Sequence, residues 1–268
     1  STSAHATLDN GTTALNLAAS SIGGNLTVTS GNASGITDSG TVTVGGNLVA
    51  TTDANNGVID LGTTTVTGTM DLTSHGTGNV TIDNGNADIV LIASEIGGTL
   101  TLTTGAGTGI TDAAGQAVTV GGNLVATTDA NDGVINLDNL AVDGTIAFAP
   151  HGSGNVTIVN DDGINFAAST IGGVLTTDDT TAFDVGETIS TGSIEGLVVL
   201  GTGGTNTVIY TGTERHLTSG AIFAAGGTIA DGGDGAALSM TKMQPGHYGD
   251  VCSDGVLLVV SETVQGIN

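Results

Sequence analysis

The chain has few of the residues from which an ordinary globular core is built. Its 268 residues include no tryptophan, two prolines, one cysteine and only 2% aromatics, whereas 46 are glycine. A compact globule of this length normally buries more large side chains. The apolar residues are mostly Val, Ile, Leu and Ala, and Thr is abundant, a mixture that favours strands. Gly, Asn, Asp and Ser interrupt the apolar runs every few residues, which indicates turns.

Positive charge is almost absent. Arg215 and Lys242 are the two basic residues against 26 acidic ones, which gives a net charge of −24. Nucleic-acid binding and attachment to anionic membranes both need a basic surface, so neither is expected. No apolar run reaches the roughly 18 residues that a membrane span needs, so no membrane-spanning segment is expected. The lone Cys252 does not fix the compartment. The start at Ser1 without Met is what removal of a secretion leader would leave, and trimming would leave the same.

Two phrases recur at one constant offset. The segment from Val44 to Ile59 reads VGGNLVATTDANNGVI, and that from Val120 to Ile135 reads VGGNLVATTDANDGVI. HGTGNVTI from His75 and HGSGNVTI from His151 have the same offset. Repetition at a fixed period is typical of repeat architectures. It points to a function carried by a surface or a fibre rather than by a single active site.

A shorter period lies within the long one. A strand that ends in Ile or Val, followed two residues later by Gly, recurs at spacings between about 22 and 30 residues. Its end positions are Ile22, Val44, Val66, Ile96, Val120, Val142, Ile171 and Ile194. Each coil would hold three short strands that alternate apolar and polar residues, with one face turned inward. We therefore predict an all-β fold, a β-solenoid (parallel β-helix) of coils of about 22–30 residues, three coils to each long repeat.

The last part of the chain departs from this pattern. After about Gly201 the coil spacing is lost, and both Tyr, both basic residues and Cys252 occur there. The run from Val256 to Val260 has five apolar residues without alternation, which is typical of a strand buried on both faces. The prediction is a solenoid domain over residues 1–200 and a distinct C-terminal β cap or assembly module over 201–268.

The repeat units resemble the filamentous-haemagglutinin type of β-helix found in large secreted bacterial adhesins. The resemblance lies in GGNLTV from Gly23, GGTLTL from Gly97, and the Gly-Ile-Thr-Asp units at Gly35 and Gly109, and it covers roughly residues 8 to 200. It implies an extracellular, non-enzymatic protein of the cell surface. The resemblance assigns no catalytic residue to this chain.

One turn resembles the front half of a calcium loop. Asp129, Asn131 and Asp132 place three oxygen side chains within one turn, although the distal Glu of such loops is missing. The twin turn carries Asp53 and Asn55, with one carboxylate fewer. Bound Ca²⁺ at either turn is therefore one hypothesis.

A second acidic pattern concerns the coil strands. Asp38 and Asp60 each follow a Gly by three positions, so in-register stacking would place them one rung apart, about 4.8 Å. Like charges that close require a proton or a cation between them. The alternative is that these side chains cap turn amides. His75 and His151, three coils or roughly 14 Å apart, are too distant to share one metal and are predicted to be turn residues.

Enzymatic activity is not predicted. Carboxylates are so common in this chain that a pair of them does not indicate a glycosidase. A polysaccharide lyase needs Arg or Lys in its cleft, and no basic residue precedes Arg215. Thr-x-Thr phrases such as Thr41-Val-Thr43 raise an ice-binding hypothesis, because flat Thr ladders can order water. Outward Thr also follows from strand propensity alone.

Two structural roles remain. The first is a structural subunit of an extracellular filament or sheath that polymerises with itself, head to tail, through the ends of the solenoid. The alternative is a stalk or passenger segment of a surface adhesin, with cell-surface or matrix glycans as partners. The end residues expected to form the assembly interface are Leu8, Leu15, Leu17, Val256, Leu257, Leu258, Val259 and Val260.

Overall fold

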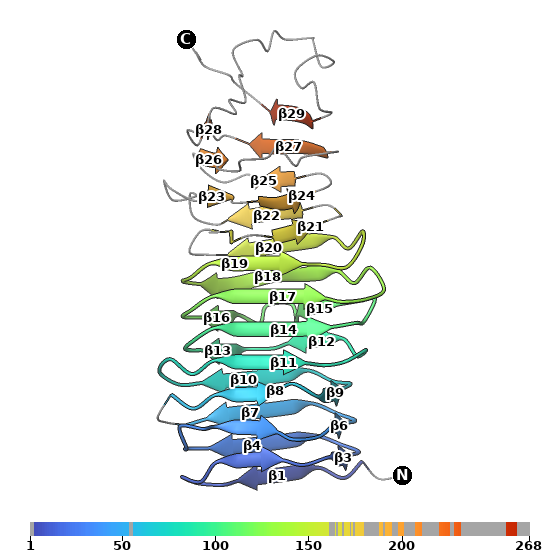
Figure 1. Ribbon diagram of the computed structural model, residues 1–268, viewed down its shortest axis with the longest axis vertical. Helices are drawn as coiled ribbons and strands as arrows, with labels where there is room; N and C mark the ends of the chain where they lie inside the picture. The colour runs from blue at the N-terminus through green and yellow to red at the C-terminus, as the bar shows by residue number, and fades with distance from the viewer. Residues whose placement is uncertain are drawn as a thin grey trace.

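The protein is a β-solenoid, an elongated stack of coils with β1 and β29 at opposite ends (Figure 1). The computed structural model describes residues 3–53, 56–160, 164, 166–167, 169–171, 173, 175–179, 188–189, 191–194, 198–200, 207–210, 220–225, 228–231 and 256–261. Every described strand pairs in parallel with the strands of neighbouring coils, about seven coils of about 22 residues each. None of the described segments forms a helix with the length and hydropathy that crossing a membrane requires.

Three sheets run along the axis of the solenoid. Sheet A contains β1 (Ala6–Asp9), β4 (Leu26–Ser30), β7 (Leu48–Thr52), β10 (Met70–Ser74), β12 (Ile89–Leu91), β13 (Ser94–Ile96), β15 (Ile110–Asp112), β16 (Val118–Val120), β18 (Ile135–Val142), β20 (Val156–Asn160), β22 (Leu175–Asp179), β25 (Val198–Leu200), β27 (Gly220–Ala225) and β29 (Val256–Ser261). Sheet B contains β2 (Leu15–Leu17), β5 (Ile36–Asp38), β8 (Ile59–Leu61), β11 (Val80–Asp83), β14 (Leu100–Thr104), β17 (Leu124–Thr128) and β19 (Ile146–Ala149). Sheet C contains β3 (Ser20–Ile22), β6 (Val42–Val44) and β9 (Thr64–Val66). Two further sheets hold β21 (Ser169–Ile171) with β24 (Thr191–Ile194), and β23 (Thr188–Ile189), β26 (Thr207–Tyr210) and β28 (Thr228–Asp231).

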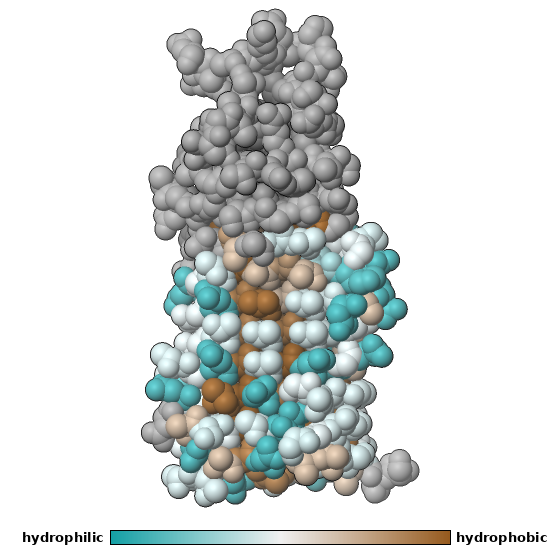
Figure 2. All heavy atoms as spheres, viewed as in Figure 1, coloured by the Kyte–Doolittle hydropathy of each residue, from teal (hydrophilic) through white to brown (hydrophobic). Residues whose placement is uncertain are grey.

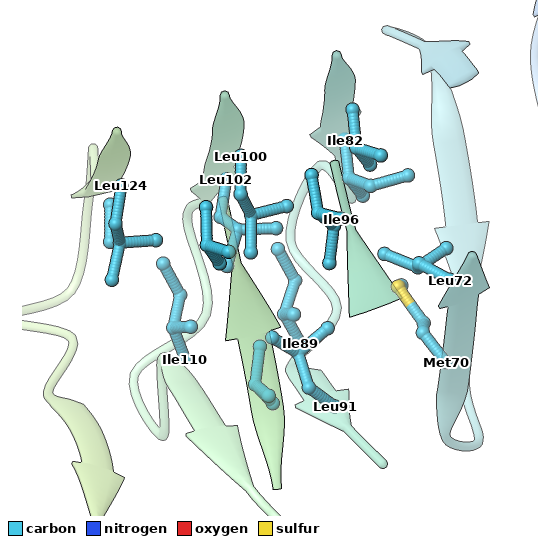
Figure 3. Packing of buried hydrophobic residues seen from close by; sticks show 14 of the residues in the cluster. Met70, Leu72, Ile82, Ile89, Leu91, Ile96, Leu100, Leu102, Ile110 and Leu124 are labelled. Atoms are coloured by element: carbon cyan, nitrogen blue, oxygen red, sulfur yellow. The ribbon is translucent and has the colours of Figure 1, made fainter. Parts of the chain in front are cut away.

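Alternation of residue types decides which side chains enter the core. In β4 the side chains of Leu26, Val28 and Ser30 are buried, while the intervening threonines are only partly covered. Because successive side chains of a strand point to opposite faces, each coil contributes its apolar residues to one continuous internal column. Figure 3 shows Leu and Ile side chains from successive coils meeting there. Outward residues stack in the same way, so Figure 2 shows narrow apolar and polar columns parallel to the long axis.

Between β4 and β20 the coils hold 21 to 25 residues, so the longer spacings of the strand motif do not make longer coils there. The longest spacing of the strand motif lies between Val66 and Ile96, yet Met70 pairs with Leu91 and Val80 pairs with Leu100. Both steps stay close to the common coil length. What changes there is the side of the solenoid on which the Gly-x-Leu strand lies. β4, β7 and β10 belong to sheet A, whereas β14 and β17 belong to sheet B.

The long repeat therefore covers about three and a half coils rather than three. The offset from Val44 to Val120 is not a whole number of coils, so half a turn is left over at the end of each repeat. As a result β7 and β17, which belong to the two nearly identical phrases, lie in different sheets. At the third repeat the Gly-x-Leu strand returns to sheet A, where Leu175 pairs with Val156.

Sheet A continues past the predicted domain boundary at residue 200. β25 pairs with β22 on one side and with β27 on the other, and β29 follows β27 as the last strand of the sheet. Most of residues 201–268 lie outside the described residues, so the predicted cap stays a prediction. Val256 to Val260 form a strand, as expected, and it pairs with β27 of the same chain.

Candidate functional site

The described parts of the two calcium-like turns share a hydroxyl bond and a left-handed residue. At the end of each preceding strand a buried threonine hydroxyl donates to a carbonyl oxygen across the turn: Thr52 to Gly57 at 3.0 Å and Thr128 to Gly133 at 2.9 Å. Asn56 and its counterpart Asp132 both have positive φ, 55° and 52°. Asn and Asp tolerate this backbone region better than most residues. These turns are therefore shaped by hydroxyl bonds and left-handed residues.

The His-Gly turn of the next coil lies directly on each of these turns. The Thr77 N–H donates to Asn56 Oδ1 at 3.0 Å, and the Ser153 N–H donates to Asp132 Oδ1 at 3.3 Å. Gly76 has φ of +64°, and a Cβ added there would lie 1.8 Å from Asn56 Oδ1. The glycine is required because the two turns interlock at this distance.

The two histidines lie in these turns, as predicted, but not on one side of the solenoid. His75 follows β10 of sheet A, whereas His151 follows β19 of sheet B, so the expected stacking three coils apart is wrong. His75 Nδ1 contacts the Thr52 carbonyl oxygen. His151 Nδ1 lies 3.3 Å from Asp132 Oδ1, with both side chains about half exposed. The half-coil offset between the repeats is the reason.

Two of the residues proposed as calcium ligands have protein partners in this structure. Asn131 donates its side-chain N–H to the Gly105 carbonyl oxygen at 2.6 Å, and Asp132 faces His151 and Ser153. Asn55 lies outside the described residues, next to Asp53. Over the described part of the chain no group of three or more His, Cys, Asp or Glu side chains is arranged to hold a metal ion. Ca²⁺ at Asp129 or Asp53 remains a hypothesis.

The expected stack of Asp38 on Asp60 is not formed. The strand register pairs Asp60 with Thr37, because the turn before Asp60 is one residue longer at Val58. Asp38 instead accepts hydrogen bonds from the Gly62 and Thr63 N–H groups at 3.2 and 2.9 Å. The alternative hypothesis of turn capping is therefore the correct one for Asp38.

Asp112 performs the same capping in the second repeat. Its carboxylate accepts from the Asp138 and Asn139 N–H groups at 3.1 and 2.8 Å. Burial raises the pKa of this carboxyl, and the two backbone hydrogen bonds oppose that rise. Each capping carboxylate thus fixes the backbone of the coil that follows it.

A ladder of buried hydroxyls was missed in the sequence. The strands that follow Gly-x-Leu or Gly-x-Met all end in a buried Ser or Thr, from β4 to β17. The hydroxyls of Thr52, Ser74 and Thr128 donate to a glycine carbonyl oxygen across the turn that follows. Those of Ser30 and Thr104 donate to carbonyl oxygens of the coil below. The signal was present, because the fifth position of these strands is always Ser or Thr.

At each junction between long repeats, a buried asparagine side chain bonds to the backbone of a strand in the coil below. Asn84 is fully buried: its Oδ1 accepts from the Val66 N–H at 2.7 Å, and its Nδ2 donates to the Val66 carbonyl oxygen at 3.0 Å. Asn160, its counterpart in the next long repeat, makes the same pair of bonds to Val142 at 2.8 and 3.4 Å. A side-chain amide thus takes the place of a strand's backbone at both junctions between long repeats.

Asn10 occupies the equivalent place at the N-terminal end. Its Nδ2 donates to the Thr13 and Ala14 carbonyl oxygens at 3.2 and 2.8 Å, as that of Asn84 does to Ala87 and Asp88 at 3.2 and 2.7 Å. Asn10 is exposed, and no N–H group among the described residues donates to its Oδ1. We call β1 together with the Asn10 turn (residues 6–14) the N-terminal edge.

The predicted interface leucines divide into two kinds. Leu15 and Leu17 point into the core and are each 8% exposed, whereas the core residues above them are almost completely covered. Leu8 is 38% exposed and lies in β1, whose described pairing is with β4 alone. Within the described residues the N-terminal edge therefore pairs on one side only and carries one exposed large apolar side chain.

Comparison with known proteins supports the repeat and leaves the function open. A family described as repeats of unknown function (DUF5649) is similar to this chain over residues 3–58 and 77–149. The two matched regions begin 74 residues apart, which is also the separation of Asn10 and Asn84 in the sequence. No curated protein and no solved structure matches the chain. The class of protein shown is thus a repeat-built β-solenoid.

Proposed function

We propose that the protein is a structural subunit of an extracellular filament or sheath and that it assembles head to tail through the ends of its solenoid. The observation that carries this proposal is the layout of sheet A, which begins with β1 and ends with β29. All its strands are parallel, so a second copy translated along the axis would continue the same sheet in the same direction. Exposed strand edges of this kind are templates for pairing with another chain.

The construction of the coils supports a structural role. The described core is a column of aliphatic side chains, and the turns are held by capping side chains and interlocking glycines. Turns held in this way give each coil a fixed outline, which regular stacking of subunits requires. The proposed extracellular location rests on the resemblance to secreted adhesin repeats.

Assembly must overcome charge repulsion. Each copy carries a net charge of −24, so end-to-end contact is opposed at low ionic strength. Salt screens such repulsion, with a Debye length of about 8 Å at physiological ionic strength. The association is therefore expected to strengthen with added NaCl.

Sedimentation velocity and negative-stain microscopy test this proposal directly. The purified chain is examined at increasing concentration in low salt and in 0.5 M NaCl. Rods that lengthen in steps of one subunit support head-to-tail assembly. Monodisperse rods of one subunit at every concentration would reject it and favour the second candidate, a stalk segment of a surface adhesin. That candidate is supported by the interlocked turns, which repeat on alternating sides of the solenoid.

A further inference from the structure

We propose that the outward face of sheet B from β14 to β19 is a contact surface for a second copy of this chain, so that two solenoids lie side by side. The inference goes beyond the proposed function, because a lateral contact does not depend on the ends of the solenoid. It supplies the step that would join single filaments into a sheath. We call this surface the uncharged face, and its outward side chains are Thr101, Thr103, Val125, Thr127, Ala147 and Ala149.

The side chains of the uncharged face stand in two straight ladders. In the first ladder Val125 lies between Thr101 and Ala147, and the second ladder runs beside it, two residues further along each strand. All of these side chains are short and in register, so the face is nearly flat. β14 and β17 lie on the near side of the molecule in Figure 1, and over them Figure 2 shows pale and brown columns between borders that carry hydrophilic residues.

These strands carry no charged side chain, although the chain has a net charge of −24. The corresponding strands of the first long repeat, β4, β7 and β10, lie in sheet A, and carboxylates interrupt their outward surface. There Asp71 pairs with Val49, which is the counterpart of Val125. Asp9 and Glu95 pair with other residues of the same strands. The half-coil offset thus places one sequence phrase on two different sheets, and only its copy on sheet B is free of neighbouring carboxylates on the strands beside it.

Two features of the uncharged face fit a second copy of the chain. Copies with a large charge of the same sign repel each other wherever carboxylates meet, so they approach closely only where carboxylates are missing. The outward ladders also repeat at the rung spacing of about 4.8 Å, and another solenoid of the same kind presents ridges at that same spacing. The ridges of one copy can therefore lie in the grooves of the other, at the roughly 10 Å separation of stacked sheets.

The contact between two single copies is expected to be weak. Three strands about 4.8 Å apart and about 15 Å long offer roughly 200 Å² of flat surface on each copy. Stable complexes bury about 1,200 Å² or more in total. Exposed carboxylates in the flanking turns, Asp132 and Asp143, add a repulsion that salt screens. Association should therefore need high protein concentration and high salt, whereas filaments lying side by side would make the same contact once per subunit.

Matched substitutions in the two copies of the phrase test this surface. Val125→Lys places a charge within the uncharged face, and Val49→Lys places the same charge at the corresponding position on sheet A. Both positions are partly exposed, and both substitutions change the net charge equally. We expect Val125→Lys to weaken self-association at least tenfold, because the contact would bury the added charge, and Val49→Lys to leave it unchanged. Sedimentation equilibrium at high protein concentration in 0.5 M NaCl measures both.

A second matched pair carries the opposite charge. Thr127→Asp should weaken self-association as Val125→Lys does, and Thr51→Asp on sheet A should not, since a buried charge of either sign opposes a contact between identical surfaces. Unchanged melting temperatures show that the variants stay folded. Equal effects within both pairs, or a wild type that stays monomeric, would overturn this inference. In negative-stain images, particles that lengthen without widening would overturn it and support the proposed function, whereas particles that widen without lengthening would do the reverse.

Discussion

Single side chains hold this solenoid together where the backbone ladder is interrupted. Asn84 and Asn160 stand in for a missing strand, Asp38 and Asp112 cap the next coil, and a row of hydroxyls closes the turns. Each of these polar groups is buried or half-buried and has its partners. In a protein without aromatic bulk, such groups define the coil geometry that packing alone would leave loose.

Asn84→Ala is expected to destabilise the protein severely. The substitution leaves the Val66 N–H and carbonyl groups buried without partners, and each such group costs about 1–3 kcal/mol. We therefore expect a loss of about 3 kcal/mol or more in the free energy of unfolding, measured by urea denaturation. Asn86→Ala, at an exposed asparagine two residues away, is the control. A loss of less than about 1 kcal/mol for Asn84→Ala would show that its amide is replaceable.

Asp71→Asn tests the electrostatic cost of a partly buried carboxylate. Burial raises the pKa of Asp71 above its ordinary value. The native state therefore holds the Asp71 proton more tightly than the unfolded state, so this group favours folding at low pH and loses that contribution as the pH rises through its native pKa. Asp71→Asn should raise the melting temperature at pH 7 and leave it unchanged at pH 3.

The exposed Asp60 supplies the comparison for that experiment. Asp60→Asn removes the same unit of charge from the molecule without relieving a buried carboxylate. A melting-temperature rise as large as that of Asp71→Asn would assign the effect to net charge rather than to burial.

At the residue level the sequence was a partial guide. Turn capping by Asp38 was recognised as one of two alternatives, but its stacking on Asp60 depended on counting residues from the preceding glycine. One extra residue in the second turn shifted that count, and a shift of one residue turns a side chain to the other face. The roles of Asn84 and Asn160 were not recognised, because an Asn within a turn-like phrase is also typical of an ordinary turn residue.

Strands of this protein tolerate charge on only one face. Val66→Asp should unfold the local coils, because Val66 is fully buried and an unpaired charge there costs several kcal/mol. Thr51→Asp should change the free energy of unfolding by less than about 1 kcal/mol, since Thr51 points outward from β7. Soluble yield and melting temperature measure both. Similar effects of the two substitutions would contradict the burial pattern of the strands.

The strands themselves were predictable, but their places in the sheets were not. The eight positions predicted to end a strand all do so, from Ile22 to Ile194. The two longest spacings, before Ile96 and before Ile171, suggested longer coils, whereas the coils at both places stay short and the motif moves to another sheet. The spacing of a motif in the sequence shows how often the motif recurs. The number of residues in one coil is known only from which strands pair.

The whole molecule combines many carboxylates with few cations, so its stability should respond to ions. We predict that millimolar CaCl₂ raises the melting temperature, and one site occupied at 100 times its dissociation constant would add about 2.7 kcal/mol. Added NaCl of equal ionic strength separates site binding from screening. Overlapping melting curves in calcium and in chelator would reject a calcium site at the Asp129 or Asp53 turn.

The half-coil offset between repeats is the central claim about the whole molecule. It decides which turns share a side of the solenoid, and it places the junctions at Asn84 and Asn160 next to strands of different sheets. The structure pairs Thr81 with Thr101 in sheet B, whereas a coil as long as the spacing from Val66 to Ile96 would place Thr101 above Asp71.

Disulfide trapping within single chains distinguishes the two arrangements most directly. Thr81→Cys with Thr101→Cys, in a Cys252→Ser background, should form an intramolecular disulfide in nearly every folded molecule, because facing strand residues lie within bonding distance. Asp71→Cys with Thr101→Cys should form none. Cross-linking of the Asp71→Cys pair, with the Thr81→Cys pair remaining reduced, would contradict the half-coil offset.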